Sequence, residues 1–171
     1  AASDAVEILT TNRKDGALTP ASLLSLVRRI PKPELSDAQW RALSTSYPNG
    51  PTYDRWDILE LWRRGITGKG VKVALLDDGA DNRHPDLAAV ENVRNYTWER
   101  HLADSPAGKT GEPDYRGWHG SHTAGTIMSL APEAQVRVFK VHERGKHGNT
   151  PSELELTGQQ HTEAFEKALQ A

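Results

Sequence analysis

The sequence contains no cysteine, and this absence excludes several kinds of chemistry. Disulfide bonds, thiolate metal sites and a cysteine nucleophile are all impossible in these 171 residues. Long hydrophobic runs are missing too, since no apolar stretch approaches the ~20 residues that span a bilayer. The polar first residues do not resemble a signal peptide, although a processed secreted protein can begin in this way. We therefore expect no membrane segment, and the compartment stays open.

An excess of charge of either sign is also lacking. The chain has 21 Lys and Arg against 23 Asp and Glu, a formal net charge of −2, and no block of like charge. Neither a nucleic acid nor an anionic membrane surface is therefore expected as a partner. The length suits one domain with an appendage and allows a substantial core.

Two short helices are predicted near the N-terminus. Thr19 and Pro20 combine an N-cap with a first-turn proline, and apolar residues follow at helical spacing as far as Ile30. Ser36 and Gln39 have the spacing of a capping box, which predicts a second helix.

A domain boundary is expected where turn-forming residues cluster at 46–51. Residues 1–50 are then a helical N-terminal extension, and residues 51–171 form the main domain. We expect the extension to be a packing element. An inhibitory pro-segment and a partner-docking arm stay open as alternatives.

Residues 51–171 begin with a predicted helix and a buried strand. Trp56, Leu59 and Trp62, with the neighbouring Ile58, fit one helical face that Gly65 ends. Residues 71–76 are almost all apolar without alternation, as in a strand that is covered on both faces. A strand of this kind is typical of a parallel sheet.

The rest of the chain continues the alternation of helices and strands. We expect a loop at 95–118, a helix from about 119 to 130, a strand at 135–141 and a last helix capped by Thr157 and Gln160. The last helix places four apolar residues on one face: Ala164, Phe165, Ala168 and Leu169. This order predicts an α/β fold.

Asp77 is a candidate catalytic residue because it ends the apolar strand. Catalytic groups in open α/β sheets gather at the carboxyl ends of strands. A carboxylate there can accept a hydrogen bond from a histidine ring and stabilise the imidazolium. The next residues, Asp78 and Gly79, also fit an ordinary turn, so Asp77 alone does not establish a site.

His119 strengthens this interpretation. It lies at the start of the predicted helix between Gly117 and Gly120, and other small residues follow. Glycine inside a helix costs ~1 kcal/mol relative to alanine, so a run of small residues indicates close packing. A histidine at such a position is a candidate general base, although a lone histidine is more often structural.

Four segments of the chain occur in the order found in the first half of a subtilisin-like serine protease domain, which the chain resembles over about residues 54–170. The four segments are residues 68–79, 84–87, 119–126 and 130–141. The resemblance implies part of a three-layer α/β fold with a mainly parallel sheet. It also implies that Asp77 is the catalytic acid that orients the ring and His119 the catalytic base, whereas His122 is a packing residue of the helix.

The resemblance suggests substrate contacts as well. Asp78 resembles the second aspartate of the kexin-like branch, where it favours basic residues beside the cleaved bond. The alternative is a turn-forming surface aspartate. Gly145 and Gly148 lie in a loop where members of the family line the substrate groove, so we expect them to contact an extended peptide.

No metal or other cofactor is expected. Relatives often carry a calcium loop after the catalytic histidine, but here residues 126–130 run directly into Ala131 and Pro132. Asp86 matches one acidic ligand, and a single carboxylate does not satisfy an ion that takes six to eight oxygens. A zinc-like site made of His119, His122 and Asp77 is an open alternative, although the histidine spacing differs from the i, i+4 motif.

The nucleophile of such a protease is not evident in this sequence. No serine after His119 has the expected setting, and the oxyanion-hole asparagine and the Gly-Thr-Ser segment of the family are missing. We therefore expect an inactive isolated chain, with a C-terminal subtilase segment or a second polypeptide supplying Asn and Ser for the hydrolysis of a peptide or protein substrate. The alternative is an inactive binding or regulatory module.

Overall fold

The computed structural model describes residues 19–30, 35–45, 53, 55–96, 117–142 and 156–170. The chain divides into two compact units, each with its own hydrophobic core. The first comprises residues 1–69 with 129–133, and the second comprises residues 70–128 with 134–171. In the described segments, no helix has both the length and the apolar character needed to cross a membrane.

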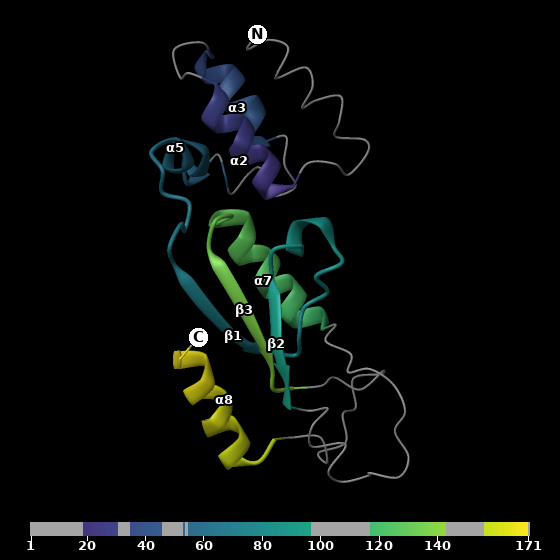
Figure 1. The fold of residues 1–171 in the computed structure, drawn as a ribbon. Coiled ribbons are helices and arrows are strands. Elements are labelled where there is room, and N and C mark those ends of the chain that lie inside the picture. Colours follow the sequence, from purple (N-terminus) through teal and green to yellow (C-terminus); the bar gives the residue numbers. More distant parts are fainter. Residues whose placement is uncertain are drawn as a thin grey trace. The chain divides into compact units, whose positions relative to one another are not determined.

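Unit 1 is helical in its described parts (Figure 1). Its helices are α2 (Pro20–Arg29), α3 (Asp37–Thr45) and α5 (Ile58–Arg63). The Thr19 hydroxyl accepts from the amide of Ser22, and the Ser36 amide donates to the side chain of Gln39 at 2.9 Å. Both predicted helices of the extension are thus confirmed. Each starts at a local cap that compensates for backbone amides without helical partners.

The core of unit 1 gathers apolar side chains from α2 and α5. Tyr53 and Trp62 are fully buried, and their rings meet edge to face with centroids 5.6 Å apart. Trp56 was predicted on the same helical face but is 57% exposed. It precedes the first residue of α5 and does not share the helical periodicity that buries Leu59 and Trp62.

Residues 129–133 contact the rest of unit 1 through polar side chains. The Tyr53 hydroxyl donates to the carbonyl of Ser129, and the Trp62 indole donates to that of Leu130 at 2.9 Å. Glu133 accepts two hydrogen bonds from Arg28, at 2.9 and 2.6 Å, and another from the Thr67 hydroxyl. These hydrogen bonds lower the pKa of Glu133 to about 2.

Unit 2 contains a three-stranded parallel sheet. Its strands β1 (Lys72–Asp77), β2 (Glu91–Asn95) and β3 (Gln135–Lys140) lie in the order β1-β3-β2. The parallel sheet and the strands β1 and β3 were predicted from the sequence and are confirmed. The sequence did not indicate β2, which is short, polar and irregular in its pairing with β3. A 3-10 turn, η3 (Pro85–Leu87), precedes it.

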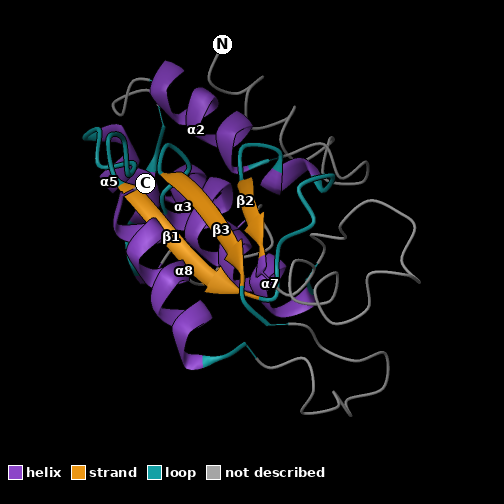
Figure 2. Cartoon of the chain, turned by 60° about the horizontal axis from the view of Figure 1, so that its bottom comes forward, coloured by secondary structure: helices purple, strands orange, loops and turns teal. Residues whose placement is uncertain are grey.

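Helices α7 (Trp118–Leu130) and α8 (Gly158–Gln170) lie on opposite faces of this sheet (Figures 1 and 2). Ala164 of α8 joins Phe139 of β3 in one buried cluster. Because side chains alternate along a strand, the buried Val136 and Val138 point to the other face, on the side of α7. This helix–sheet–helix arrangement confirms the predicted α/β fold.

Two burial predictions for unit 2 are wrong. Strand β1 was expected to be covered on both faces, but Lys72 and Ala74 are exposed. Only part of the predicted apolar face of α8 is buried. Ala164 is buried, whereas Phe165 and Leu169 are 58% and 74% exposed. Strand β1 lies at the edge of the described sheet, where it pairs with β3 alone, and α8 contacts this edge strand.

The ion pair of Glu133 makes the stability of unit 1 dependent on pH. Its folded pKa of about 2 is below the ordinary 4.5, so its contribution is complete above pH ~4.5 and is lost as the pH falls toward 2. We expect urea unfolding to show that Glu133→Gln lowers stability near pH 6, and that its difference from the wild type shrinks over this range.

The exposed glutamate of α8 supplies the control. Glu166→Gln removes a similar charge without touching Arg28 or Thr67, so its difference from the wild type should stay small throughout. A Glu133→Gln difference that stays constant from pH 6 to pH 2.5 contradicts the assigned pairing.

Candidate active site at the end of β1

The predicted acid and base are brought together at the carboxyl end of β1. Asp77 is the last residue of β1, and His119 is the second residue of α7. The Nδ1 atom of His119 lies 2.9 Å from each carboxylate oxygen of Asp77. The Asp77 side chain is 11% exposed and that of His119 is 67% exposed, so the pair joins a shielded carboxylate to an accessible ring.

This geometry shows which nitrogen of the imidazole is the hydrogen-bond donor and which can accept a proton. A carboxylate only accepts hydrogen bonds, so Nδ1 of His119 is the donor and Nε2 is the nitrogen that can take up a proton. Oxygen Oδ1 of Asp77 also accepts from the amide of Asp78 at 2.7 Å, which fixes the orientation of the carboxylate. The pair can therefore act as an oriented general base.

Side chains that the sequence analysis did not single out hold the turn after β1. The Asn92 amide group donates to the carbonyl of Ala80 at 2.8 Å and accepts from the amide of Ala80 at 3.1 Å. The Ser121 hydroxyl accepts from the amide of Asp81 at 2.9 Å. Gly79 has φ +100°, a conformation that glycine adopts readily. The sequence indicates only the positive φ, through the glycine at position 79. It does not indicate the contacts of Asn92 and Ser121, because these residues are distant in sequence from the turn.

Ser121 is the serine nearest to His119 in sequence, and its hydroxyl is already engaged. It donates its single proton to the carbonyl of Gly117 while it accepts from Asp81. Ser129, at the other end of α7, is buried. Neither serine is presented as a nucleophile to His119.

Asp78 was predicted to bind substrate, but its carboxylate points to the start of α7. It is 3% exposed, and it accepts from the amides of His119 at 3.2 Å and Gly120 at 2.7 Å. A carboxylate at a helix N-terminus is favoured by the unpaired amides and by the helix dipole. Its role toward substrate stays a prediction. Gly145 and Gly148 lie outside the described residues.

His122 does not pack as the resemblance implied. Its side chain is exposed, and it lines a cavity of about 280 Å³ together with Asp81, His84 and Asp86. Across the described segments, no group of three or more potential ligands is placed to hold a metal ion. The zinc-like alternative, which needed His122 beside His119 and Asp77, is thus not formed there.

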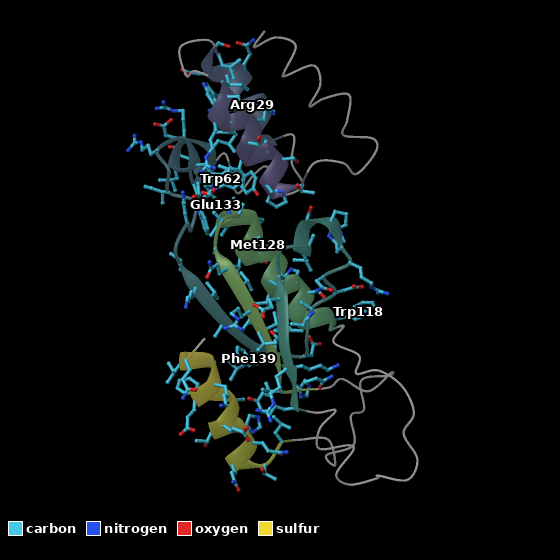
Figure 3. The ribbon with its side chains drawn as sticks, in the orientation of Figure 1. Arg29, Trp62, Trp118, Met128, Glu133 and Phe139 are labelled. Carbon is cyan, nitrogen blue, oxygen red and sulfur yellow. The ribbon has the colours of Figure 1, made fainter. Side chains whose placement is uncertain are left out.

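Trp118 is a further residue at this end of α7 that sequence reasoning missed (Figure 3). It precedes His119 and is 90% exposed, the highest exposure among the large apolar side chains described. An exposed indole beside a candidate base is suited to apolar contact with a bound molecule.

Comparison with known families identifies the class of protein. The sequence model of the subtilase family, Peptidase_S8, matches residues 68–164, which is more than half of the chain and includes both Asp77 and His119. The chain therefore belongs to the subtilase family and carries part of its protease domain.

Two similar proteins are proteases of Bacillus subtilis. The chain is 37% identical to the major intracellular serine protease of Bacillus subtilis over 110 residues, which are 58% of this chain and 32% of that protein. It is 32% identical over 122 residues to the minor extracellular protease Vpr of the same organism, covering 67% of this chain and 14% of Vpr. The chain thus spans at most about a third of the length of these two relatives. No solved structure matches significantly.

The close contact between α7 and the turn after β1 predicts opposite effects of two glycine substitutions. A Cβ at Gly120 would lie 2.1 Å from the backbone oxygen of Gly79, so Gly120→Ala should destabilise the protein by about 1–3 kcal/mol. A Cβ at Gly125, in the same helix, meets only a Leu87 methyl at 3.9 Å. Gly125→Ala should therefore stabilise the protein by about 0.5–1 kcal/mol.

Urea unfolding of the two variants checks this prediction. Both add one methyl group to the same helix, so a shared change in helix propensity cancels between them. Equal effects of the two substitutions would contradict the close approach at Gly120.

Proposed function

We propose that this chain supplies the acid and the base of a subtilisin-like serine endopeptidase. A serine-bearing segment, from the same precursor or from a second polypeptide, completes the active site. The observation that carries the proposal is the hydrogen bond from His119 to Asp77 at the end of a parallel strand, inside the region that matches the family. The accessible ring and the shielded acid suit their separate roles.

The proposed reaction follows from the two ring nitrogens. Nε2 of His119 takes the proton of the incoming serine hydroxyl as the serine oxygen bonds to the peptide carbonyl carbon. The imidazolium then gives this proton to the leaving amine as the peptide bond breaks and an acyl-enzyme forms. Water releases the acyl group by the same proton transfers. Asp77 accepts from Nδ1 throughout and stabilises the charged ring.

A surface at β1 and α8 supports the involvement of a further segment. Strand β1 has one free edge in the described sheet, and an open edge is suited to pairing with another strand. Beside it, α8 contacts β1 and exposes Phe165 and Leu169. We assign this surface to the serine-bearing segment, because the aligned parts of this chain cover only 32% and 14% of the two relatives, which therefore contain further chain.

The substrate is proposed to be a peptide or protein in extended conformation. Gly145 and Gly148 remain proposed contacts because of their place in the sequence before α8. The 67% exposure of the His119 side chain supports access of a substrate to the base.

Labelling with a serine-directed fluorophosphonate tests the proposal. The protein isolated from its source is expected to show a partner or a larger precursor in native mass spectrometry, and the assembled species is expected to react with the probe. In the assembled protein, Asp77→Asn should lower kcat by about 10⁴-fold, because the ring loses its orienting acceptor, and His119→Ala should lower it at least as much.

His122→Ala is the matched control, since it removes an exposed histidine from the same helix. It should retain labelling and turnover. A single 18.9 kDa species that never reacts with the probe under native conditions would contradict the proposal and favour the inactive binding module.

The proposed partner surface gives a separate prediction. Leu169→Ser should leave the stability of the isolated chain within about 0.5 kcal/mol, because the side chain is already 74% exposed. It should nevertheless weaken assembly with the serine-bearing segment, measured by titration of the fluorophosphonate signal. Glu166→Gln, on the same helix, is the control, and an equal effect of both substitutions would contradict the assignment.

A further inference from the structure

We propose that Asp78 is a positioning residue that holds the backbone of His119 at the end of β1, and that it does not recognise substrate. The proposal rests on the function proposed for His119. The proposal replaces the substrate-binding role that the sequence suggested for Asp78. In addition to Asp77, a second aspartate then holds His119 in place.

The burial of Asp78 is the first observation. The residue is 3% exposed, and a buried carboxylate is costly unless hydrogen bonds compensate for the loss of water. One oxygen accepts from the amide of Gly120 at 2.7 Å, and the other accepts from the amide of His119 at 3.2 Å. Both donors are amides of the first turn of α7, which have no carbonyl partner within the helix.

The two glycines beside His119 are the second observation. A Cβ at Gly117 would lie 2.2 Å from Oδ1 of Asp78, and a Cβ at Gly120 would lie 3.1 Å from the same atom. A side chain at Gly117 would therefore occupy the space of the carboxylate, and one at Gly120 would crowd it. The absence of side chains at these positions allows Asp78 to reach the start of α7.

Adjacent carboxylates thus hold the two parts of His119. Asp77 accepts from the ring at Nδ1, and Asp78 accepts from the backbone amide. The amide of Asp78 also donates to Asp77, so the two aspartates are fixed relative to each other. A shift of the helix start would move the ring away from Asp77, and misplacement by about 1 Å can reduce a catalysed rate by a factor of about 100.

A role in recognising basic side chains would require a different arrangement. An exposed acid can pair with a lysine or arginine of a substrate, whereas both oxygens of Asp78 already accept from α7. Pairing with a substrate would expose the carboxylate and compete with the amides that hold α7. The described geometry therefore favours the positioning role.

The first test uses the isolated chain and needs no activity. Asp78→Leu removes both acceptors at similar side-chain size, and Asp78→Asn keeps one. In Asp78→Leu, we expect amide exchange of Gly120 to be about tenfold faster or more, and the Nδ1 proton resonance of His119 to be lost in ¹⁵N-histidine spectra. Asp78→Asn should be intermediate in both measurements.

Asp81→Asn is the control, because it removes a charge from the same turn where the carboxylate pairs with Arg83, and it keeps the backbone amide that donates to Ser121. It should leave both signals unchanged. If Asp78→Leu does not fold, the comparison of Asp78→Asn with Asp81→Asn still tests whether Asp78 holds the start of α7. An unchanged Nδ1 resonance and unchanged Gly120 exchange in Asp78→Asn would overturn the proposal.

The second test uses the assembled enzyme and two peptide series that differ only in a basic or neutral residue beside the cleaved bond. If Asp78 positions His119, Asp78→Asn should lower kcat about tenfold for both peptide series and leave KM little changed. A loss confined to the basic series, seen mainly in KM, would overturn the proposal in favour of substrate recognition. Failure to find any assembled enzyme would contradict the function proposed above, while the spectroscopic test would still decide the role of Asp78.

Discussion

The junction between the end of β1 and the start of α7 is the contact on which the site depends. It joins residues more than forty positions apart, and it uses backbone amides, two carboxylates and two glycines. Amides at a helix start lack helical partners, and a buried carboxylate lacks water, so each group satisfies the other. The accessible ring of His119 is thereby attached to a rigid sheet.

The turn after α7 has a comparable role in unit 1. Tyr53 and Trp62 donate to the carbonyls of the last two residues of α7, and Arg28 donates to Glu133 in the turn that follows. Arg28 pairs with Glu133 in a bidentate manner, which is the stronger form of such contacts. Arg28 of α2 and the residues Tyr53 and Trp62 are therefore part of one packed unit with residues 129–133.

Local patterns in the sequence predicted much of the fold. The caps at Thr19, Ser36 and Thr157 were correct because each depends on residues three positions apart. Burial was predicted less well. Trp56 and Leu169 are exposed, and β2 was missed, because exposure and pairing depend on which distant segments cover an element.

The sequence by itself determined the caps, the apolar strands, the parallel sheet and the acid and base candidates, because these follow from short-range spacing and residue chemistry. Tertiary structure alone decided that Asp77 reaches Nδ1 of His119, that Asp78 turns inward to the helix, and that Asn92 and Ser121 hold the intervening turn. These contacts join segments separated by a dozen to more than forty residues. Their geometry is set by the packing of α7 on the sheet, which no local pattern encodes.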